Sequence, residues 1–125
     1  MQLLLDTHIY IWWLADDKRL STKARNAIKE ADRVYVSAVS LFECAIKIQL
    51  GKMKITIDEL TREINANDFL ALPLCAEQTK ILSTMARHHG DPFDRMLIAQ
   101  ALSEPLHFLT ADKSLAAYSE LVLVA

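Results

Sequence analysis

Four acidic residues carry the chemistry that this sequence predicts, because each lies where a strand is expected to end or a helix to begin. They are Asp6, Glu43, Asp94 and Asp112. In a sheet of parallel strands, the carboxyl ends of the strands border one crevice, which is the usual ligand site of such folds. We therefore expect the four carboxylates to gather in that crevice.

Each acid taken singly also has a structural explanation. Asp112 suits a helix N-cap, and Asp6 suits a turn. Glu43 suits a capping box begun by Ser40, and Asp94 suits the first turn of a helix. These separate explanations do not account for all four acids lying in one crevice. Four carboxylates placed so close together repel one another unless a cation compensates their charge.

A cation held by these side chains is expected to be Mg²⁺ or Mn²⁺. The ligands would all be carboxylate oxygens, and no His or Cys stands at metal-ligand spacing, which favours a hard cation over zinc. We assign no catalytic role to any histidine. Such an ion activates water and stabilises the charge that develops when a phosphodiester is cleaved. The cluster therefore predicts a nuclease site.

The segment around Asp94 predicts how that acid is positioned. Gly90 is expected to end a helix over residues 76–89 in the left-handed conformation. Asp91 then suits an N-cap and Pro92 the first residue of the next helix. From Met96 to Leu102 the sequence is apolar apart from one glutamine, so the body of this helix is expected to be buried.

The other elements alternate between strands and helices. Short apolar runs predict strands over 2–5, 34–36, 106–109 and 121–124, with an edge strand over 69–74 because it contains Pro73. Helices are expected over 21–31, from about 40 to 50, over 56–67 and over 112–118. The alternation predicts one domain over residues 1–125, a three-layer α/β/α sandwich with a mainly parallel sheet of four to five strands.

The run Ile9 to Leu14 is apolar over six consecutive residues, which one face of a helix cannot bury. Either a partner covers part of it, Trp12 or Trp13 in particular, or the helix is packed between other elements on both sides. The sequence leaves these two alternatives open.

Composition excludes several classes of protein. The chain has 125 residues, 52% of them hydrophobic, and a net charge of −2, so no overall basic field attracts nucleic acid. A nucleic acid would have to bind through a local patch or a metal.

No apolar run approaches the roughly 20 residues of a membrane span, and Asp6 interrupts Leu3 to Leu5 too early for a signal peptide. Cys44 and Cys75 are expected to be buried free thiols, so we expect a cytoplasmic protein.

Four segments together span nearly the whole chain. They are LLLDTH at 3–8, SLFE at 40–43, HGDPFDRMLIAQA at 89–101 and LTAD at 109–112. In their order and spacing they resemble the PIN-domain family, and more narrowly the VapC-type toxins of bacterial and archaeal toxin–antitoxin pairs. The third segment is the most specific of the four.

The resemblance implies an Mg²⁺- or Mn²⁺-dependent endoribonuclease that is a homodimer or higher homo-oligomer and is silenced by a cognate antitoxin protein. The metal-binding and catalytic residues it implies are Asp6, Glu43, Asp94 and Asp112. The accessory residues are Asp91, with Thr7, Ser40 and Thr110 orienting carboxylates or water. No acid of the pattern is missing.

Two other functions deserve comparison with a nuclease. A catalytically silent PIN-like interaction module is disfavoured by the complete set of acids. A receiver-type phosphoacceptor domain needs an adjacent acidic pair after its first strand and a lysine near its last, whereas Asp6 stands alone.

Some basic residues near these acids have two interpretations. Arg95 either contacts an RNA phosphate or forms an ion pair with a neighbouring acid. Lys47 follows Glu43 by four residues, the spacing of a helical ion pair. Lys52, Lys54 and Arg62 form either a basic rim for RNA or an ordinary solvated face.

Overall fold

A computed structural model describes residues 1–125 and places five parallel strands in a single sheet. The strands are β1 (Gln2–Leu5), β2 (Arg33–Ser37), β3 (Leu70–Leu72), β4 (His107–Thr110) and β5 (Val122–Val124). Their order across the sheet is β3-β2-β1-β4-β5, and all four neighbouring pairs are parallel. Parallel strands need crossover connections, which here are helices. The predicted α/β/α sandwich is confirmed, with β3 at one edge as its Pro73 indicated.

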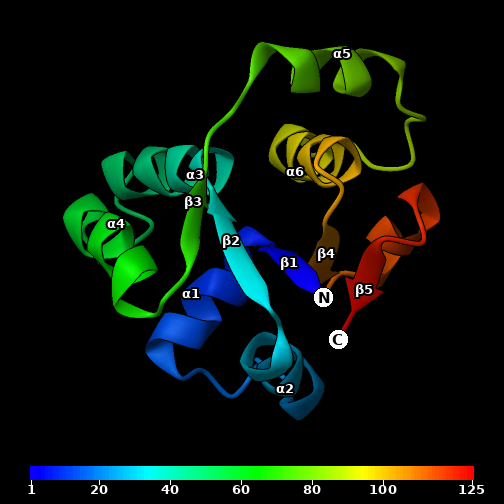
Figure 1. The fold of residues 1–125 in the computed structure, drawn as a ribbon. Helices are drawn as coiled ribbons and strands as arrows, with labels where there is room; N and C mark the ends of the chain where they lie inside the picture. Colours follow the sequence, from blue (N-terminus) through cyan, green and yellow to red (C-terminus); the bar gives the residue numbers. More distant parts are fainter.

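Six α-helices and a short 3₁₀ helix flank the sheet (Figure 1). They are α1 (Thr7–Ala15), α2 (Thr22–Glu30), α3 (Ala38–Gln49), α4 (Ile57–Ala66), α5 (Ala76–Thr84), α6 (Pro92–Ser103) and the 3₁₀ helix η1 (Lys113–Tyr118). One face of the sheet packs against α1, α2 and α4, and the other against α6 and η1. Helix α3 contacts α1, α4 and α6, so it joins the two layers.

The central strand β1 contributes to both hydrophobic cores. Leu3 and Leu5 belong to the core under α1, α2 and α4, whereas Leu4 belongs to the core under α6. Successive side chains of a strand point to opposite faces, and both faces of this sheet are covered. This explains why the sequence of β1 is continuously apolar rather than alternating, and why its end lies deep in the molecule.

Helix α6 is buried on nearly every side, as its apolar sequence predicted. Residues 96–101 are all buried, because α5 lies outside α6 and the sheet lies inside it (Figure 1). The buried Gln100 is satisfied: its Oε1 accepts from the Ser37 hydroxyl, and its Nε2 donates to the Pro73 carbonyl at 3.2 Å and to Gln78 Oε1 at 3.1 Å. These bonds tie α5 and α6 to β2 and to the segment that follows β3.

The predictions for α5 and Gly90 were wrong. Helix α5 ends at Thr84, five residues earlier than predicted, and Met85 is already extended with ψ 144°. Gly90 is not in the left-handed region; among the glycines only Gly51, after α3, has a positive φ, of 73°. The backbone N–H of His89 donates to the Tyr118 hydroxyl at 2.8 Å. This contact joins the segment between α5 and α6 to the end of η1.

Helix α3 begins earlier than its predicted capping box. Ser37 is the N-cap, and its side chain accepts a hydrogen bond from the Val39 N–H at 3.0 Å. Ser40 therefore lies inside the helix rather than at its cap, and Glu43 lies on the second turn rather than the first. The other predicted box is confirmed, since Thr56 caps α4 and accepts from the Glu59 N–H at 3.1 Å.

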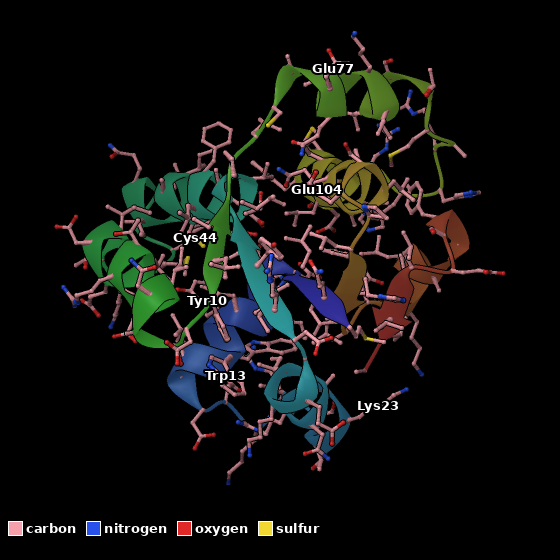
Figure 2. The ribbon with its side chains drawn as sticks, in the orientation of Figure 1. Tyr10, Trp13, Lys23, Cys44, Glu77 and Glu104 are labelled. Carbon is pink, nitrogen blue, oxygen red and sulfur yellow. The ribbon has the colours of Figure 1, made fainter.

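The apolar run of α1 is packed between other elements on both sides. Ile9 and Tyr10 are buried, and the Tyr10 hydroxyl donates to the Leu60 carbonyl of α4 at 2.7 Å. Tyr10 and Trp13 both extend from α1 (Figure 2). Trp13 Nε1 donates to Asn67 Oδ1 at 3.0 Å, where α4 ends. Trp12 stays half-buried. Packing of α1 between other elements thus accounts for most of the apolar residues from Ile9 to Leu14. Burial of Trp12 by a partner protein stays a prediction.

Two further observations concern the expectations from composition. Cys44 is buried as predicted, but Cys75 is exposed, because it precedes α5 in the surface segment after β3. None of the helices has both the length and the apolar content needed to cross a lipid bilayer.

Candidate metal and catalytic site

The four predicted acids come from four different elements that meet at the carboxyl edge of the sheet. Asp6 directly follows β1, and Asp112 follows β4 and caps η1. Glu43 lies on α3 and Asp94 on the first turn of α6. Because β1 and β4 are neighbouring parallel strands, their ends lie side by side. Helices α3 and α6, which contact each other, add the two remaining acids.

Asp94 lies at the electrostatic centre of this cluster. The pKa of its carboxyl group is raised to about 7, first by burial and then by the negative charges of Asp6, Asp91, Glu43 and Asp112. Each of these charges disfavours ionisation of Asp94. The four acids are therefore close enough for each to act on the central one, as the sequence predicted.

Asp6 is held rigidly at the bottom of the crevice. Its backbone N–H donates to the Leu109 carbonyl at 2.9 Å, and its Oδ2 accepts from the Thr110 hydroxyl at 2.6 Å. Burial raises the pKa of Asp6, although the hydrogen bond from Thr110 opposes this shift. The hydrogen bond from Thr110 thus restrains the orientation of this carboxylate.

Two buried carboxylate oxygens in the crevice have no hydrogen-bond partner. They are Asp6 Oδ1 and Glu43 Oε1. The other oxygen of Glu43 is 3.1 Å from Lys47 Nζ, the predicted i,i+4 ion pair. A buried acceptor without a donor costs free energy, and a cation is the partner that two such anionic oxygens favour. The residues present therefore fit a hard metal ion.

Thr7 and Ser40 hydrogen-bond to each other instead of to a carboxylate. The Thr7 hydroxyl donates to Ser40 Oγ at 2.8 Å, and both side chains are buried. This bond joins the start of α1 to α3, the helix that carries Glu43. In this arrangement the two hydroxyls fix the relative position of the elements that bear Asp6 and Glu43.

Asp91 is the predicted N-cap of α6. Its Oδ1 accepts from the N–H groups of Phe93 and Asp94, at 2.8 and 3.0 Å. This bond fixes the first turn of the helix and hence the place of Asp94. The charge of Asp91 also contributes to the raised pKa of Asp94.

His89 also lies in the crevice, a position that its residue type and spacing did not predict. Its Nε2 is 3.6 Å from Asp112 Oδ2, and its Nδ1 is 3.9 Å from Asp94 Oδ2. His89, Asp94 and Asp112 each offer one ligand atom, and these atoms lie within 4.8 Å of one another. The only feature of the sequence that could have indicated this position is that His89 lies two residues before the N-cap Asp91. The Asp91 N–H donates to His89 Nδ1 at 3.1 Å.

The remaining charged groups are arranged as follows. Arg95 forms no ion pair, so the predicted ion pair with a neighbouring acid was wrong. Its Nε is buried without a partner.

The pKa of Asp112 is shifted in the opposite direction to that of Asp94, because a hydrogen bond from the Ser114 side chain lowers the pKa of Asp112. The crevice thus combines two carboxyl groups with raised pKa values, Asp6 and Asp94, with one whose pKa is lowered, Asp112.

The metal-free protein is expected to lose stability as pH rises from 3.8 to about 7. Asp94 has a raised pKa in the folded state, so the folded state binds this proton more tightly than the unfolded chain between the ordinary value of 3.8 and about 7. The unfolding free energy then falls with rising pH, by at most about 1.4 kcal/mol per pH unit for one group. Thermal scans in EDTA measure this slope. It should flatten in Asp94→Asn, and an unchanged slope would contradict the assignment.

Sequence comparison gives two matches to known proteins. The chain matches the PIN domain family over residues 3–121. It is also 30% identical over 122 residues to Ribonuclease VapC22 of Mycobacterium tuberculosis (strain ATCC 25618 / H37Rv), an alignment that covers 90% of this chain and 88% of that protein.

Two solved structures share the fold over nearly their whole length. The crystal structure of VapBC2 from Rickettsia felis bound to a DNA fragment from their promoter has a TM-score of 0.70 and 13% identity, covering 100% of this chain and 98% of that one. A toxin–antitoxin complex from Klebsiella pneumoniae has a TM-score of 0.68 and 17% identity, covering 98% and 96%. At these identities the likeness concerns the fold.

Proposed function

The chain belongs to the PIN-domain family, and from this membership we infer that it is a metal-dependent endoribonuclease, the toxin of a type II toxin–antitoxin pair. The relative that is 30% identical is named a ribonuclease, which supports cleavage of RNA. Membership of this family also makes the receiver-type alternative wrong. A silent interaction module is disfavoured because all four predicted acids reach the crevice.

One observation carries the proposal that the nuclease uses a metal. Asp6 and Glu43 each have an unpartnered, buried oxygen, and both belong to the cluster of acids that raises the pKa of Asp94. We propose that Asp6, Glu43, Asp94 and Asp112 hold Mg²⁺ or Mn²⁺. When bound there, such an ion lowers the pKa of water and stabilises charge on the phosphate during cleavage.

The chain's own residues prepare the site for this chemistry. Thr110 orients Asp6, and Asp91 fixes the helical turn that carries Asp94. Lys47 balances part of the charge of Glu43. We assign Arg95, which has no carboxylate partner, to the contact with an RNA phosphate. Its guanidinium provides donors with the geometry that phosphate oxygens accept.

We propose two protein partners as well. Two fold neighbours are toxin–antitoxin complexes, which supports a cognate antitoxin as one partner. A second copy of the chain is the other, as a homodimer or a higher homo-oligomer. The exposed Phe42 and Leu74 border an apolar pocket with Phe93, between α3 and the segment that leads into α5. Such an apolar surface is typical of an interface.

The direct test is incubation with single-stranded RNA in the presence of Mn²⁺ and, separately, of EDTA. We expect endonucleolytic cleavage with Mn²⁺, leaving 5′-phosphate and 3′-hydroxyl ends, and none in EDTA. Sequencing the cleaved ends of cellular RNA after induced expression would identify the target. Cleavage that persists in EDTA would contradict the metal-dependent mechanism, and intact RNA under every metal condition would contradict the nuclease.

A further inference from the structure

A groove runs from the acidic crevice along the start of α1. Its inner end is lined by Asp6 and Asp112 together with His8, Trp12 and Arg19. The latter three residues also line an adjoining pocket, which continues past α1 to α3 and the segment after it. The two depressions adjoin at these three shared residues, and we call them together the Trp12 groove.

Trp12 offers a stacking surface at the middle of this groove. The guanidinium carbon of Arg19 lies 5.2 Å from the centroid of the Trp12 ring, and the His8 ring lies 5.8 Å away. Nucleobases that are not paired in a duplex stack on aromatic rings and on guanidinium planes. Trp12 packs against the hydrophobic core and still remains half-exposed.

The outer part of the groove is positively charged, in contrast to the chain as a whole. Its ionisable side chains other than the buried Cys44 are all basic: His8, Arg19, Lys47 and Lys52. Two of these cations have carboxylate partners, since Arg19 pairs with Asp17 at 2.7 Å and Lys47 with Glu43 at 3.1 Å.

Arg19 and Lys52 keep donors for a phosphate. Asp17 occupies only Nε and one terminal nitrogen of Arg19, and Lys52 has no carboxylate partner within ion-pair distance. Lys47 lies between the acidic crevice and the groove, so it connects the two. A local basic channel thus begins where the proposed cleavage site ends.

We propose that the Trp12 groove binds a nucleotide of single-stranded RNA next to the cleaved phosphate, with its base against Trp12 and Arg19 and its phosphate near Lys47 and Lys52. This proposal rests on the proposed ribonuclease function. It implies selection for unpaired RNA, because the bases of a duplex are already stacked on one another and cannot reach Trp12. A peptide of a partner protein is the competing occupant, but the basic lining favours a polyanion.

The base contact is tested by RNA binding without cleavage. The Asp94→Asn protein in EDTA keeps RNA intact and removes one repelling charge, so it serves as the background for a fluorescence-anisotropy titration with a labelled single-stranded RNA. Adding Trp12→Ala should weaken binding by about tenfold or more, the range for loss of one stacked base. Trp12→Phe, which keeps an aromatic ring, should retain most of the affinity. Trp13→Phe is the matched control, since Trp13 contacts Asn67 and Phe69 outside the groove.

The phosphate contact is tested by the salt dependence of the same binding. Loss of one phosphate contact to single-stranded nucleic acid reduces the slope of log K against log salt by about 0.7. Lys52→Gln should show this reduction. Lys80→Gln should not, because Lys80 is exposed on α5 and pairs with Glu77 far from the groove.

The outcomes separate this proposal from the proposed function. If wild-type protein does not cleave RNA with Mn²⁺, the ribonuclease itself is wrong. If it cleaves, but Trp12→Ala and Trp12→Phe both bind RNA like their background, only the groove is wrong. The proposal would also be overturned if Trp12→Ala left the RNA affinity unchanged but weakened binding of the cognate antitoxin. The groove would then be a binding site for that protein. Thermal scans of each variant exclude a loss of folding as the cause.

Discussion

Replacing Asp94 with Asn is expected to abolish metal-dependent RNA cleavage and to leave the fold intact. The amide has nearly the shape of the carboxylate but lacks its charge, so the site loses a metal ligand. The helix keeps its N-cap, because Asp91 accepts the backbone N–H of residue 94 whatever the side chain there. Removing the group with the raised pKa also relieves repulsion within the cluster.

Cleavage rates with Mn²⁺, measured on the same RNA for wild type and variant, test this expectation. We expect activity to fall well below a tenth of the wild-type value. Asp58→Asn is a matched control, because Asp58 also lies in the first turn of a helix, α4, but is exposed. Activity above a tenth of wild type in Asp94→Asn would remove Asp94 from the site.

Asp6→Asn is expected to raise the melting temperature of the metal-free protein and to remove most of the stabilisation by Mn²⁺. Burial raises the pKa of Asp6, so its ionised form costs stability at neutral pH. Asn abolishes that cost and still offers an oxygen to the Thr110 hydroxyl. The gain should be on the order of 1 kcal/mol for each unit of pKa shift relieved.

Added metal should stabilise the wild type much more than the variant. Binding to the folded state alone stabilises wild type by about 2.7 kcal/mol when the free ion is at 100 times its Kd. The variant lacks the charge that draws the ion to the unpartnered Oδ1, so its shift should be much smaller. Thermal scans at neutral pH with EDTA and with excess Mn²⁺ give both quantities. A variant less stable than wild type in EDTA, with a full Mn²⁺ shift, would show that Asp6 is structural.

Several features of this protein follow from short stretches of sequence, because the forces that determine them are local. The N-cap Asp91 followed by Pro92 starts α6 where the sequence predicted, since a side-chain acceptor and a preset φ act within one turn. The continuous apolar run of β1 predicts a strand buried on both faces. Strand–helix alternation then places Asp6 and Asp112 at one edge of the sheet, because parallel strands end at the same side.

Other features were decided only by contacts between distant residues. Ser37 and Ser40 both suit an N-cap, and the structure uses Ser37, whose hydroxyl also bonds Gln100 of α6. The segment between α5 and α6 contacts a distant element, since the His89 N–H donates to the hydroxyl of Tyr118, 29 residues further along the chain. Cys75 is exposed because its segment runs over the surface before α5.

The composition of the site shows the same division. The four acids are recognisable from the sequence because each ends a strand or lies near the start of a helix, whereas His89 joins them only through the path of the chain between α5 and α6. The Trp12 groove likewise combines α1 with Lys47 and Lys52, which are far from it in sequence. Periodicity and capping specify elements within a few residues. Which side chains share a crevice depends on how those elements pack, and packing is a property of the whole chain.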